Sequence, residues 1–388
     1  MSLQPIKILH LVPTLSSGGA ERQLANVVRG TSREIVNHVI CVIGEPYFFS
    51  KDIRDAGFKV IELNISGKRP FLKAALKFRK IIAEEKPDII HSWLYDANVS
   101  ARFANLLNGK TPIITSLQLA DYEPEVARIG NYNPRKVQAL KYIDKFTALV
   151  AKPFFVPCSE FVKNSYARRY GLDESRTQVI YNAVDPSGLP ASEDDLKKIR
   201  AELKLPPDAF IYLNVGRLDP QKNHKILFEA FRDVSAEIPN AFLLLAGIGP
   251  LENELKKLAG NLEIAGKIIF LGRRNDVGAL LELADVFAFP SFFEGLPVAL
   301  IEAMFKRLPC VASRIEVFEE VISSRETGLL INPNSAAELK DAMIELYKNA
   351  DLRKSLGENA LREAKAKYDI AVTARQWEKF YQKVKAAA

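Results

Sequence analysis

The amino-acid sequence predicts an α/β protein of two Rossmann-like, doubly wound parallel sheets whose strand ends face an interdomain cleft. Three observations support this. Short apolar runs alternate with longer amphipathic stretches along the whole 388-residue chain, which is typical of βαβ units. The alternation stops at a proline-rich, charged segment and then starts again. The chain is also long enough for two domains of about 150 residues each.

The first half contains seven short runs that predict strands, each rich in Val, Ile or Phe. Between them, apolar residues recur at helical spacing over 20–28 and 71–84. The predicted strands are residues 6–12, 37–43, 59–63, 89–92, 112–116, 154–158 and 178–181.

A segment with several prolines around a charged helical stretch, at 185–208, indicates an exposed connection. We assign 1–188 to the first domain, 189–207 to a linker and 208–370 to the second domain, and we expect a helix at 371–388 to pack back on the first domain. In the second half the predicted strands are 210–215, 241–246, 267–271, 286–289, 310–312 and 328–331. Helices are predicted from 224, from 251, over 277–284 and 298–307, and through most of the C-terminus.

The charge balance differs between the two halves. The chain carries 54 Lys and Arg against 47 Asp and Glu, and the whole excess lies in residues 1–188. No motif accompanies this charge that would indicate nucleic-acid binding. Three widely spaced cysteines fit a reducing compartment, and there is no signal-peptide-like or membrane-spanning run. We therefore expect a cytoplasmic protein, with any membrane contact peripheral.

A glycine pair, Gly18 and Gly19, follows the first predicted strand and opens a helix within the run 16–22. Paired glycines let the backbone approach a ligand, and a helix N-terminus offers free amides to an anion. Phosphate is the ligand that this arrangement favours, although a plain glycine turn explains the pair almost as well. The spacing is not the dinucleotide-binding fingerprint, so an ordinary NAD-dependent oxidoreductase is not favoured.

Two further segments of the second half carry candidate chemistry. Gly216, Arg217 and Lys222 follow the first strand there, where two cations could neutralise a leaving diphosphate. Glu294 and Glu302 lie eight positions apart around a helix start, and carboxylates suit a ligand rich in hydroxyl groups. Surface charges are the alternative interpretation of both segments, but Glu302 lies in an apolar run where an unpartnered carboxylate would be costly.

Together these residues resemble the retaining glycosyltransferases of family 4, which have the two-domain GT-B architecture. Glu294 and Glu302 match the E-x7-E signature of that family. The stretches 18–21, 179–185, 215–222 and 326–330 are similar to further family segments and occur in the same order. The resemblance covers the chain from about residue 6 to its C-terminus.

The resemblance implies that the second domain binds a nucleoside-diphosphate sugar and the first domain binds a glycan or lipid-linked acceptor. It implies transfer with retention of anomeric configuration, without a cofactor or an obligatory metal. Arg217 and Lys222 would stabilise the leaving diphosphate, Glu302 would accept from the ribose hydroxyls, and Glu294 would face the donor sugar. The remaining donor-binding positions are Gly18, Gly19, Gly216, Gly295, Leu296 and Pro297.

The sequence departs from the family pattern in two places. Many relatives have a histidine after the strand at 112–116, but this chain has Gln118 and Asp121 there, and His91 ends the preceding strand. These three are acceptor-side candidates, although His91 could equally be a core histidine beside Trp93. The segment 313–321 lacks the glycine pair of many relatives, which leaves open the backbone contacts to the donor.

Two questions stay open at this level. A nucleotide-sugar 2-epimerase of the same architecture, or a non-catalytic sugar-nucleotide-binding protein, would carry the same motifs. The basic stretch 67–73, with Lys77, Arg79 and Lys80, could contact an anionic membrane or could be a solvated helix face. The donor base, the sugar and the acceptor are not specified by these motifs.

Overall fold

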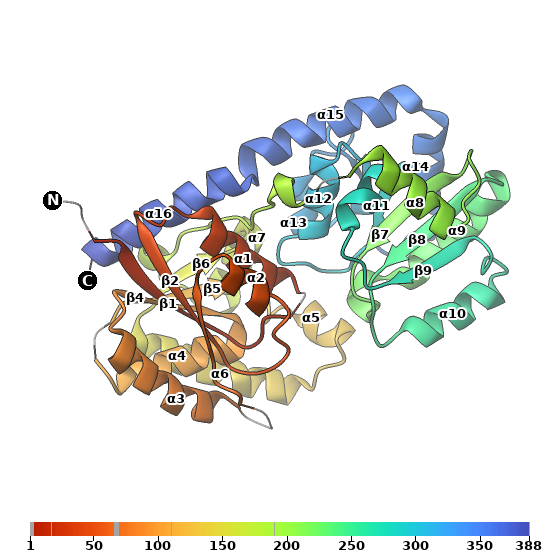
Figure 1. Ribbon diagram of the computed structural model, residues 1–388. Helices are drawn as coiled ribbons and strands as arrows, with labels where there is room; N and C mark the ends of the chain where they lie inside the picture. The colour runs from red at the N-terminus through yellow and green to blue at the C-terminus, as the bar shows by residue number, and fades with distance from the viewer. Residues whose placement is uncertain (1–3, 17, 66–69, 110, 190, 388) are drawn as a thin grey trace. The chain divides into compact units, whose positions relative to one another are not determined.

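The computed structural model describes residues 4–16, 18–65, 70–109, 111–189 and 191–387 (Figure 1). Contacts divide the chain into two compact units, Met1–Ala183 with Ile370–Ala388, and Val184–Asp369. Ser17 of the glycine-pair run, Pro190 of the predicted linker and residues 67–69 of the basic stretch lie outside the described residues.

The first unit contains a six-stranded, all-parallel sheet with the strand order β3-β2-β1-β4-β5-β6. This is the Rossmann order, in which the direction of winding reverses between β1 and β4. The predicted doubly wound α/β fold is therefore confirmed. The strands are β1 (Ile6–Val12), β2 (Val36–Val42), β3 (Lys59–Glu62), β4 (Ile89–Trp93), β5 (Ile113–Leu117) and β6 (Phe154–Pro157).

The seventh strand predicted in the first half, 178–181, is wrong. Gln178 N–H donates to Phe155 O and Ile180 N–H donates to Pro157 O, so the segment does run beside β6. The ladder would next require a hydrogen bond from the backbone nitrogen of residue 157, and proline has no N–H to donate. One isolated bridge, between Phe155 and Thr177, is all that forms.

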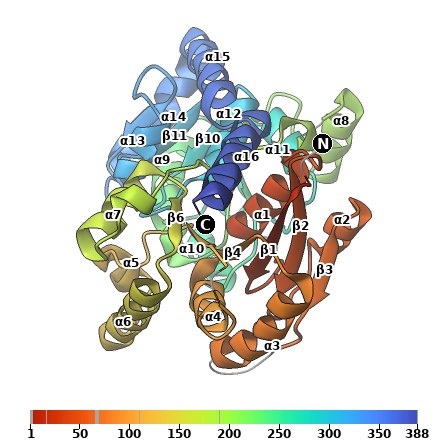
Figure 2. The same cartoon turned by 90° about the vertical axis from the view of Figure 1, so that its left-hand side faces the viewer.

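Helices cover both faces of the first sheet. Figures 1 and 2 show α3, α4 and α6 along one side, while α1 and α16 pack together on the other face. Each face is sealed by its own apolar cluster, because every strand of a parallel sheet alternates buried side chains on both sides. The helices of this unit are α1 (Gly19–Gly30), α2 (Ser50–Asp55), α3 (Pro70–Glu85), α4 (Leu94–Leu106), α5 (Pro124–Ile129), α6 (Pro134–Ala151), α7 (Glu160–Arg169) and α16 (Ile370–Ala386).

The C-terminal helix α16 belongs to the first unit although it is last in the sequence. Its apolar residues recur at helical spacing and bury Trp377, Phe380, Tyr381 and Val384 in the core beside α1. The two ends of the described chain therefore lie in one unit.

The second unit repeats the same architecture. Its six parallel strands have the order β12-β11-β10-β7-β8-β9, so the winding reverses between β7 and β10. Loops that follow β7 and β10 therefore flank the position where ligands bind in such sheets. The strands are β7 (Phe210–Val215), β8 (Ala241–Ala246), β9 (Ile268–Gly272), β10 (Val286–Phe289), β11 (Cys310–Ser313) and β12 (Leu329–Ile331).

The segment expected to be a linker, 189–207, is part of the second unit. It contains a helix with an N-terminal capping box at Ser192 and Asp195, and Ile199 and Leu205 are buried, because the helix packs against its neighbour α11. The division between the units falls instead before Val184. The helices of this unit are α8 (Glu193–Glu202), α9 (His224–Glu237), α10 (Glu252–Asn261), α11 (Val277–Leu283), α12 (Val298–Phe305), α13 (Glu316–Val321), α14 (Ala336–Lys348) and α15 (Ala350–Lys367).

Candidate functional site

The loop between β7 and α9 positions Lys222 beside the sheet. Residues Pro220–Lys222 form a single 3-10 turn, and Asn223 follows in the left-handed conformation before α9 begins. The Lys222 side chain then lies across Gly216, where a Cβ atom would approach Lys222 Cε to 3.0 Å. Glycine at 216 therefore makes room for the lysine at the C-terminal edge of the sheet.

Lys222 forms an ion pair with Glu294, which follows β10. The two side chains meet at 2.5 Å between Nζ and Oε1, and only 13% and 10% of their surfaces are exposed. The ammonium group also lies 4.7 Å from the centre of the Phe289 ring. The structure thus brings together two residues that the sequence proposed separately, from loops on adjacent strands.

Two hydrogen bonds, one between backbones and one from a side chain, join these two loops. Phe292 N–H donates to Gln221 O at 2.9 Å, and Gln221 Nε2 donates to Phe293 O at 2.8 Å. These bonds hold Lys222 and Glu294 in a fixed relation before any ligand binds. Preorganised charge of this kind costs little reorganisation during a reaction.

Helix α12 follows Glu294 and carries the second carboxylate of the pair. Pro297 occupies its N-cap position, and the segment from Gly295 to Pro297 leads into its first turn. Glu302 lies in this helix with only 5% of its surface exposed. The free N–H groups of the first turn can donate hydrogen bonds to a phosphate.

Arg217 differs from Lys222 in its environment. Its side chain is 74% exposed, and its Nε lies 3.4 Å from Asp219 Oδ2. An exposed pair of this kind contributes little to stability, so the side chain is free to reach a ligand at little cost.

Four buried polar atoms near these loops have no hydrogen-bond partner within the described part of the chain. Ser291 and His224 come after β10 and β7, Asp219 lies in the β7 loop, and Ser313 ends β11. Buried polar groups are normally paired, so unpaired ones at a ligand-binding edge indicate hydrogen bonds to a ligand. The atoms are Ser291 Oγ, Ser313 Oγ, Asp219 Oδ1 and His224 Nδ1.

Sequence reasoning did not single out these four residues. The signal available was their place at the ends of strands of a parallel sheet. His224 also contacts Asn214 Oδ1 through Nε2 at 3.2 Å, and burial lowers its pKa to about 4. The imidazole is therefore neutral at pH 7 and can donate or accept one hydrogen bond.

In the first unit, Gly18 is the N-cap residue of α1. Glu21 folds back over it, and its Oε1 accepts hydrogen bonds from Thr14 Oγ1 at 2.8 Å and Ser16 Oγ at 2.7 Å. A Cβ atom at Gly18 would collide with Glu21 Oε2. The buried Glu21 carboxylate therefore already lies at this helix start, which makes the Gly18 and Gly19 turn less favourable for a phosphate than the sequence suggested.

The three acceptor-side candidates have different environments. His91 is fully buried, and its Nδ1 and Nε2 form hydrogen bonds with the hydroxyl groups of Tyr381 and Ser116 at 2.9 and 2.8 Å. The geometry supports the core alternative for His91 rather than a substrate contact. Asp121 accepts a hydrogen bond from Tyr166, and burial raises its pKa to about 6.

Gln118 lies directly after β5. Its Oε1 is buried without a hydrogen-bond partner in the described chain, as at the four atoms of the second unit. It is the one acceptor-side candidate among the described residues with an unmet hydrogen-bonding need.

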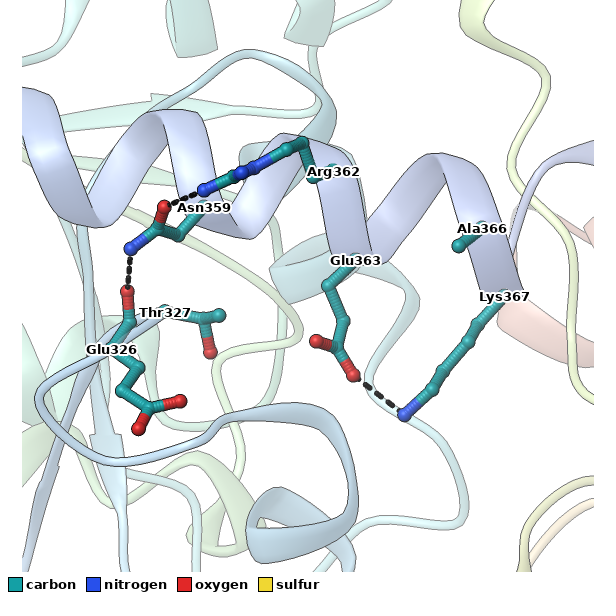
Figure 3. Close-up of a pocket in the computed structure, with 7 residues that line it drawn as sticks. All are labelled: Glu326, Thr327, Asn359, Arg362, Glu363, Ala366 and Lys367. Carbon is teal, nitrogen blue, oxygen red and sulfur yellow. Dashed lines mark hydrogen bonds and ion pairs between the residues drawn. The ribbon is translucent and has the colours of Figure 1, made fainter.

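A polar pocket of about 490 Å³ lies elsewhere in the second unit, between the loop before β12 and helix α15 (Figure 3). Its polar groups pair with one another: Asn359 Nδ2 donates to Glu326 O at 2.9 Å, and Lys367 meets Glu363 at 2.5 Å. The loop precedes β12, so this pocket lies at the sheet edge opposite to Lys222. Residues 326–328 therefore lie before the start of β12, whereas Leu329 and Leu330 lie within the strand.

No group of three His, Cys, Asp or Glu side chains within the described ranges is arranged to hold a metal ion. The acidic residues of the candidate site are the ion-paired Glu294, the buried Glu302 on α12 and Asp219 of the β7 loop.

Comparison with known proteins matches both halves of the chain to sequence families. Residues 17–187 match the family described as Glycosyltransferase Family 4, and residues 195–363 match Glycosyl transferases group 1. The two matches meet near the boundary between the structural units.

Two relatives with specific enzyme names align over most of the chain. An N-acetylgalactosaminyltransferase from Campylobacter jejuni, named for a diphospho-undecaprenol-linked acceptor, is 26% identical and covers 93% of this chain and 95% of its own. An Escherichia coli enzyme named UDP-Gal:alpha-D-GlcNAc-diphosphoundecaprenol alpha-1,3-galactosyltransferase is 28% identical, with 71% and 70% covered.

Solved structures share the fold. The Anabaena protein HepE in complex with UDP and glucose superimposes with a TM-score of 0.85 at 21% identity, covering 97% of this chain and all of its own. WaaG, a glycosyltransferase involved in lipopolysaccharide biosynthesis, gives a TM-score of 0.76 at 15% identity, with 97% and 99% covered.

Proposed function

Because the chain belongs to the glycosyltransferases that combine the family 4 and group 1 sequence families, we propose that it transfers a hexose from a UDP-sugar to a lipid-linked glycan with retention of configuration. The UDP donor and the diphospho-undecaprenol-linked acceptor are those named for its relatives. The observation that carries the proposal is the buried Lys222–Glu294 pair at the point where the second sheet reverses its winding.

The second unit binds the donor in this proposal. Lys222, Arg217 and the first-turn amides of α12 face the diphosphate and neutralise the charge that develops as it leaves. Glu302 accepts hydrogen bonds from the ribose hydroxyls, and Glu294 faces the sugar. A phosphate oxygen would replace Glu294 as the partner of Lys222, so donor binding exchanges one charge pair for another.

In the transfer step, the bond between the sugar C1 and the diphosphate oxygen breaks and a bond from C1 to an acceptor hydroxyl oxygen forms. The acceptor proton passes to the leaving diphosphate, so no protein base is required. The first unit binds the acceptor, with Gln118 and Asp121 as the candidate contacts. Gly18 and Gly19 are further donor contacts in this proposal, at a helix start where the Glu21 carboxylate already lies.

An epimerase and a non-catalytic binding protein are less favoured, because the two relatives above are named as transferases. Analysis of donor incubated without acceptor separates these functions, since an epimerase alone would convert the donor sugar. We also assign the protein to the cytoplasm, with peripheral membrane contact. Its three cysteines are buried free thiols, and none of the described helices combines the length and apolarity needed to span a bilayer.

A thermal-shift titration tests the donor class. A ligand at a concentration a hundredfold above its Kd stabilises the native state by about 2.7 kcal/mol. If the donor is a UDP-sugar, UDP should raise the melting temperature more than GDP or ADP does at the same concentration. Glu302→Gln should reduce the UDP effect and the rate of transfer. Absence of saturable binding by any nucleotide, together with unchanged transfer by Glu302→Gln, would refute the proposal.

A further inference from the structure

Helix α6 presents an exposed apolar face. Tyr142, Phe146, Leu149 and Val150 are 63%, 62%, 73% and 47% exposed. Their spacing of four, three and one residues places all of them on one side of the helix. Large apolar side chains gathered in this way indicate a surface that another body covers.

A groove runs along this face. It has a volume of about 580 Å³ and an apolar floor that includes Phe155 and Tyr170 from neighbouring elements. Tyr142, Phe146 and Leu149 of α6 form one wall. The groove is large enough to take up an acyl chain of a lipid.

Cations surround the groove. Lys145, Lys152 and Arg176 line it, against a single carboxylate, Asp173. Asp173 Oδ1 already accepts hydrogen bonds from the backbone and hydroxyl of Ser175. The surface therefore combines an apolar floor with a positively charged margin.

The helix itself repeats this bias. Arg135, Lys136, Lys141 and Lys145 are its charged side chains apart from Asp144. Asp144 is buried and is paired with Arg102 at 2.5 Å, so it does not offset the positive surface.

Buried hydrogen bonds fix helix α6, and with it the apolar face, on the rest of the first unit. Arg102 of α4 donates to both the backbone oxygen and the carboxylate of Asp144, and Tyr122 donates to the same carboxylate at 2.7 Å. These buried bonds fix the orientation of α6 on α4. The exposure of its apolar residues is therefore a property of the folded unit.

We propose that this surface, which we call the α6 face (Tyr142, Lys145, Phe146, Leu149, Val150 and Lys152), docks the protein on a phospholipid membrane with anionic headgroups. The apolar side chains enter the interface and the lysines meet the headgroup phosphates. This inference rests on the proposed lipid-linked acceptor, which would lie in the same membrane. A second copy of the chain is a poorer occupant, because its lysines would face these lysines.

Helix α3 offers a comparison. It exposes Leu72 and Leu76 and carries Lys73, Lys77, Arg79 and Lys80, for which the sequence left open a membrane contact or a solvated helix face. Lys77 Nζ donates to Leu63 O and Arg79 Nε donates to Asn108, so two of these cations are already bonded within the protein. No groove among the cavities described accompanies its leucines.

Vesicle flotation tests the proposal with the full chain. Vesicles of equal parts phosphatidylglycerol and phosphatidylcholine should bind the protein, and vesicles of phosphatidylcholine alone should bind it far less. Phe146→Glu should weaken binding at least tenfold. Lys145→Gln with Lys152→Asn should weaken it by about fivefold per lysine, since each contributes about 1 kcal/mol near an anionic surface.

Leu76→Glu on α3 is the matched control, because it places the same charge at a similarly exposed leucine. It should leave vesicle binding within about twofold of the unmodified protein. Equal loss from Leu76→Glu and Phe146→Glu, or tight binding by Phe146→Glu, would overturn the α6 assignment. UDP binding by each variant is measured alongside: retained UDP binding shows that a change in flotation concerns the α6 face and not the donor site.

Discussion

Lys222 Nζ and Glu294 Oε1 lie 2.5 Å apart although their residues are 72 positions apart in the chain. The Lys222 ammonium group is nearly buried, its charge is neutralised by the Glu294 carboxylate, and it lies at the place proposed for the leaving diphosphate. A substrate phosphate would have to compete with Glu294 for this ammonium group. The charge of Lys222 is therefore compensated by Glu294 in the free protein, and it can pair with a phosphate when the donor displaces the Glu294 carboxylate.

Lys222→Met should lower the rate of transfer by about a hundredfold to a thousandfold, because one preorganised partner of the developing charge is lost. Weaker UDP binding should accompany this, measured by calorimetry. Lys225→Met is the matched control, since Lys225 is 75% exposed on the adjacent helix and lies 3.9 Å from Glu229. Comparable losses in the two variants would indicate a general effect of charge and not a site at Lys222.

Glu302→Gln should weaken the binding of the ribose without weakening the binding of the diphosphate. Loss of a hydrogen bond to a charged acceptor costs about 1.5–3 kcal/mol, so UDP affinity should fall roughly tenfold to a hundredfold. Affinity for inorganic diphosphate should stay the same, because that ligand has no ribose. Calorimetric titration with both ligands checks this, and an equal loss of affinity for both would contradict the assignment of Glu302 to the ribose.

The fold was predictable because buried parallel strands appear in the sequence as short apolar runs that alternate with amphipathic helices. Alternating apolar runs identified all six strands of the first sheet to within one residue at each end. The additional run 178–181 failed as a strand because Pro157 cannot donate the return hydrogen bond. The linker prediction relied on prolines and charge, which do not reveal that Ile199 and Leu205 are buried.

The site was predictable only in part. Lys222 and Glu294 follow strands that are neighbours in the Rossmann order, so their proximity follows from the topology. The unpaired atoms of Ser291 and Ser313, and the exposed face of α6, depend on side-chain surroundings that no local pattern encodes. His91 looked like a site residue because the predicted strand ended at residue 92, but β4 continues to Trp93 and His91 lies in its middle.

Three histidines of the first unit, His10, His38 and His91, should make it sensitive to acid. Trp93 Nε1–H donates to His10 Nδ1 at 3.1 Å, which leaves His10 Nε2–H to donate to His38 Nδ1 at 2.8 Å. Thr31 Oγ1 donates to Val27 O, so it accepts from His38 Nε2–H. His10 and His38 are therefore neutral, and neither has a ring nitrogen free for another proton.

Burial lowers the pKa of His38 to about 3 and those of His10 and His91 well below 6.5. The unfolded chain binds protons near pH 6.5 while the folded unit does not, so stability is complete above pH 6.5 and falls as the pH drops towards the folded values. The slope should reach about 1.4 kcal/mol per pH unit for each histidine.

Tryptophan fluorescence during urea unfolding measures this in the first unit alone, because the chain's two tryptophans, Trp93 and Trp377, both lie there. His38→Asn should reduce the slope between pH 6 and pH 5 by one histidine's share, whatever its effect at pH 7. A free energy of unfolding that stays constant from pH 7 to pH 5 would be incompatible with the neutral chain of hydrogen bonds.

The buried ion pair between Arg102 and Asp144 should be costly to break. Their side chains are 0% and 5% exposed, and removal of one partner leaves an uncompensated buried charge. Arg102→Met should reduce the free energy of unfolding of the first unit by about 3–5 kcal/mol, measured by tryptophan fluorescence. Adding Asp144→Leu should recover part of this loss. If the double variant is as unstable as the sum of the single variants, the two residues do not act as a pair.

Gln118→Met should change the KM for the acceptor without reducing the free energy of unfolding of the first unit. Gln118 Oε1 is buried and unpaired in the described structure, so its replacement by an apolar side chain of similar length should leave the free energy of unfolding unchanged or higher. If the oxygen contacts the acceptor, the KM for acceptor should rise about tenfold while UDP affinity stays constant. Steady-state kinetics at saturating donor give the first quantity and calorimetry gives the second. A variant that loses stability without a change in acceptor KM would assign Gln118 to the core, because a structural role predicts no selective effect on the acceptor.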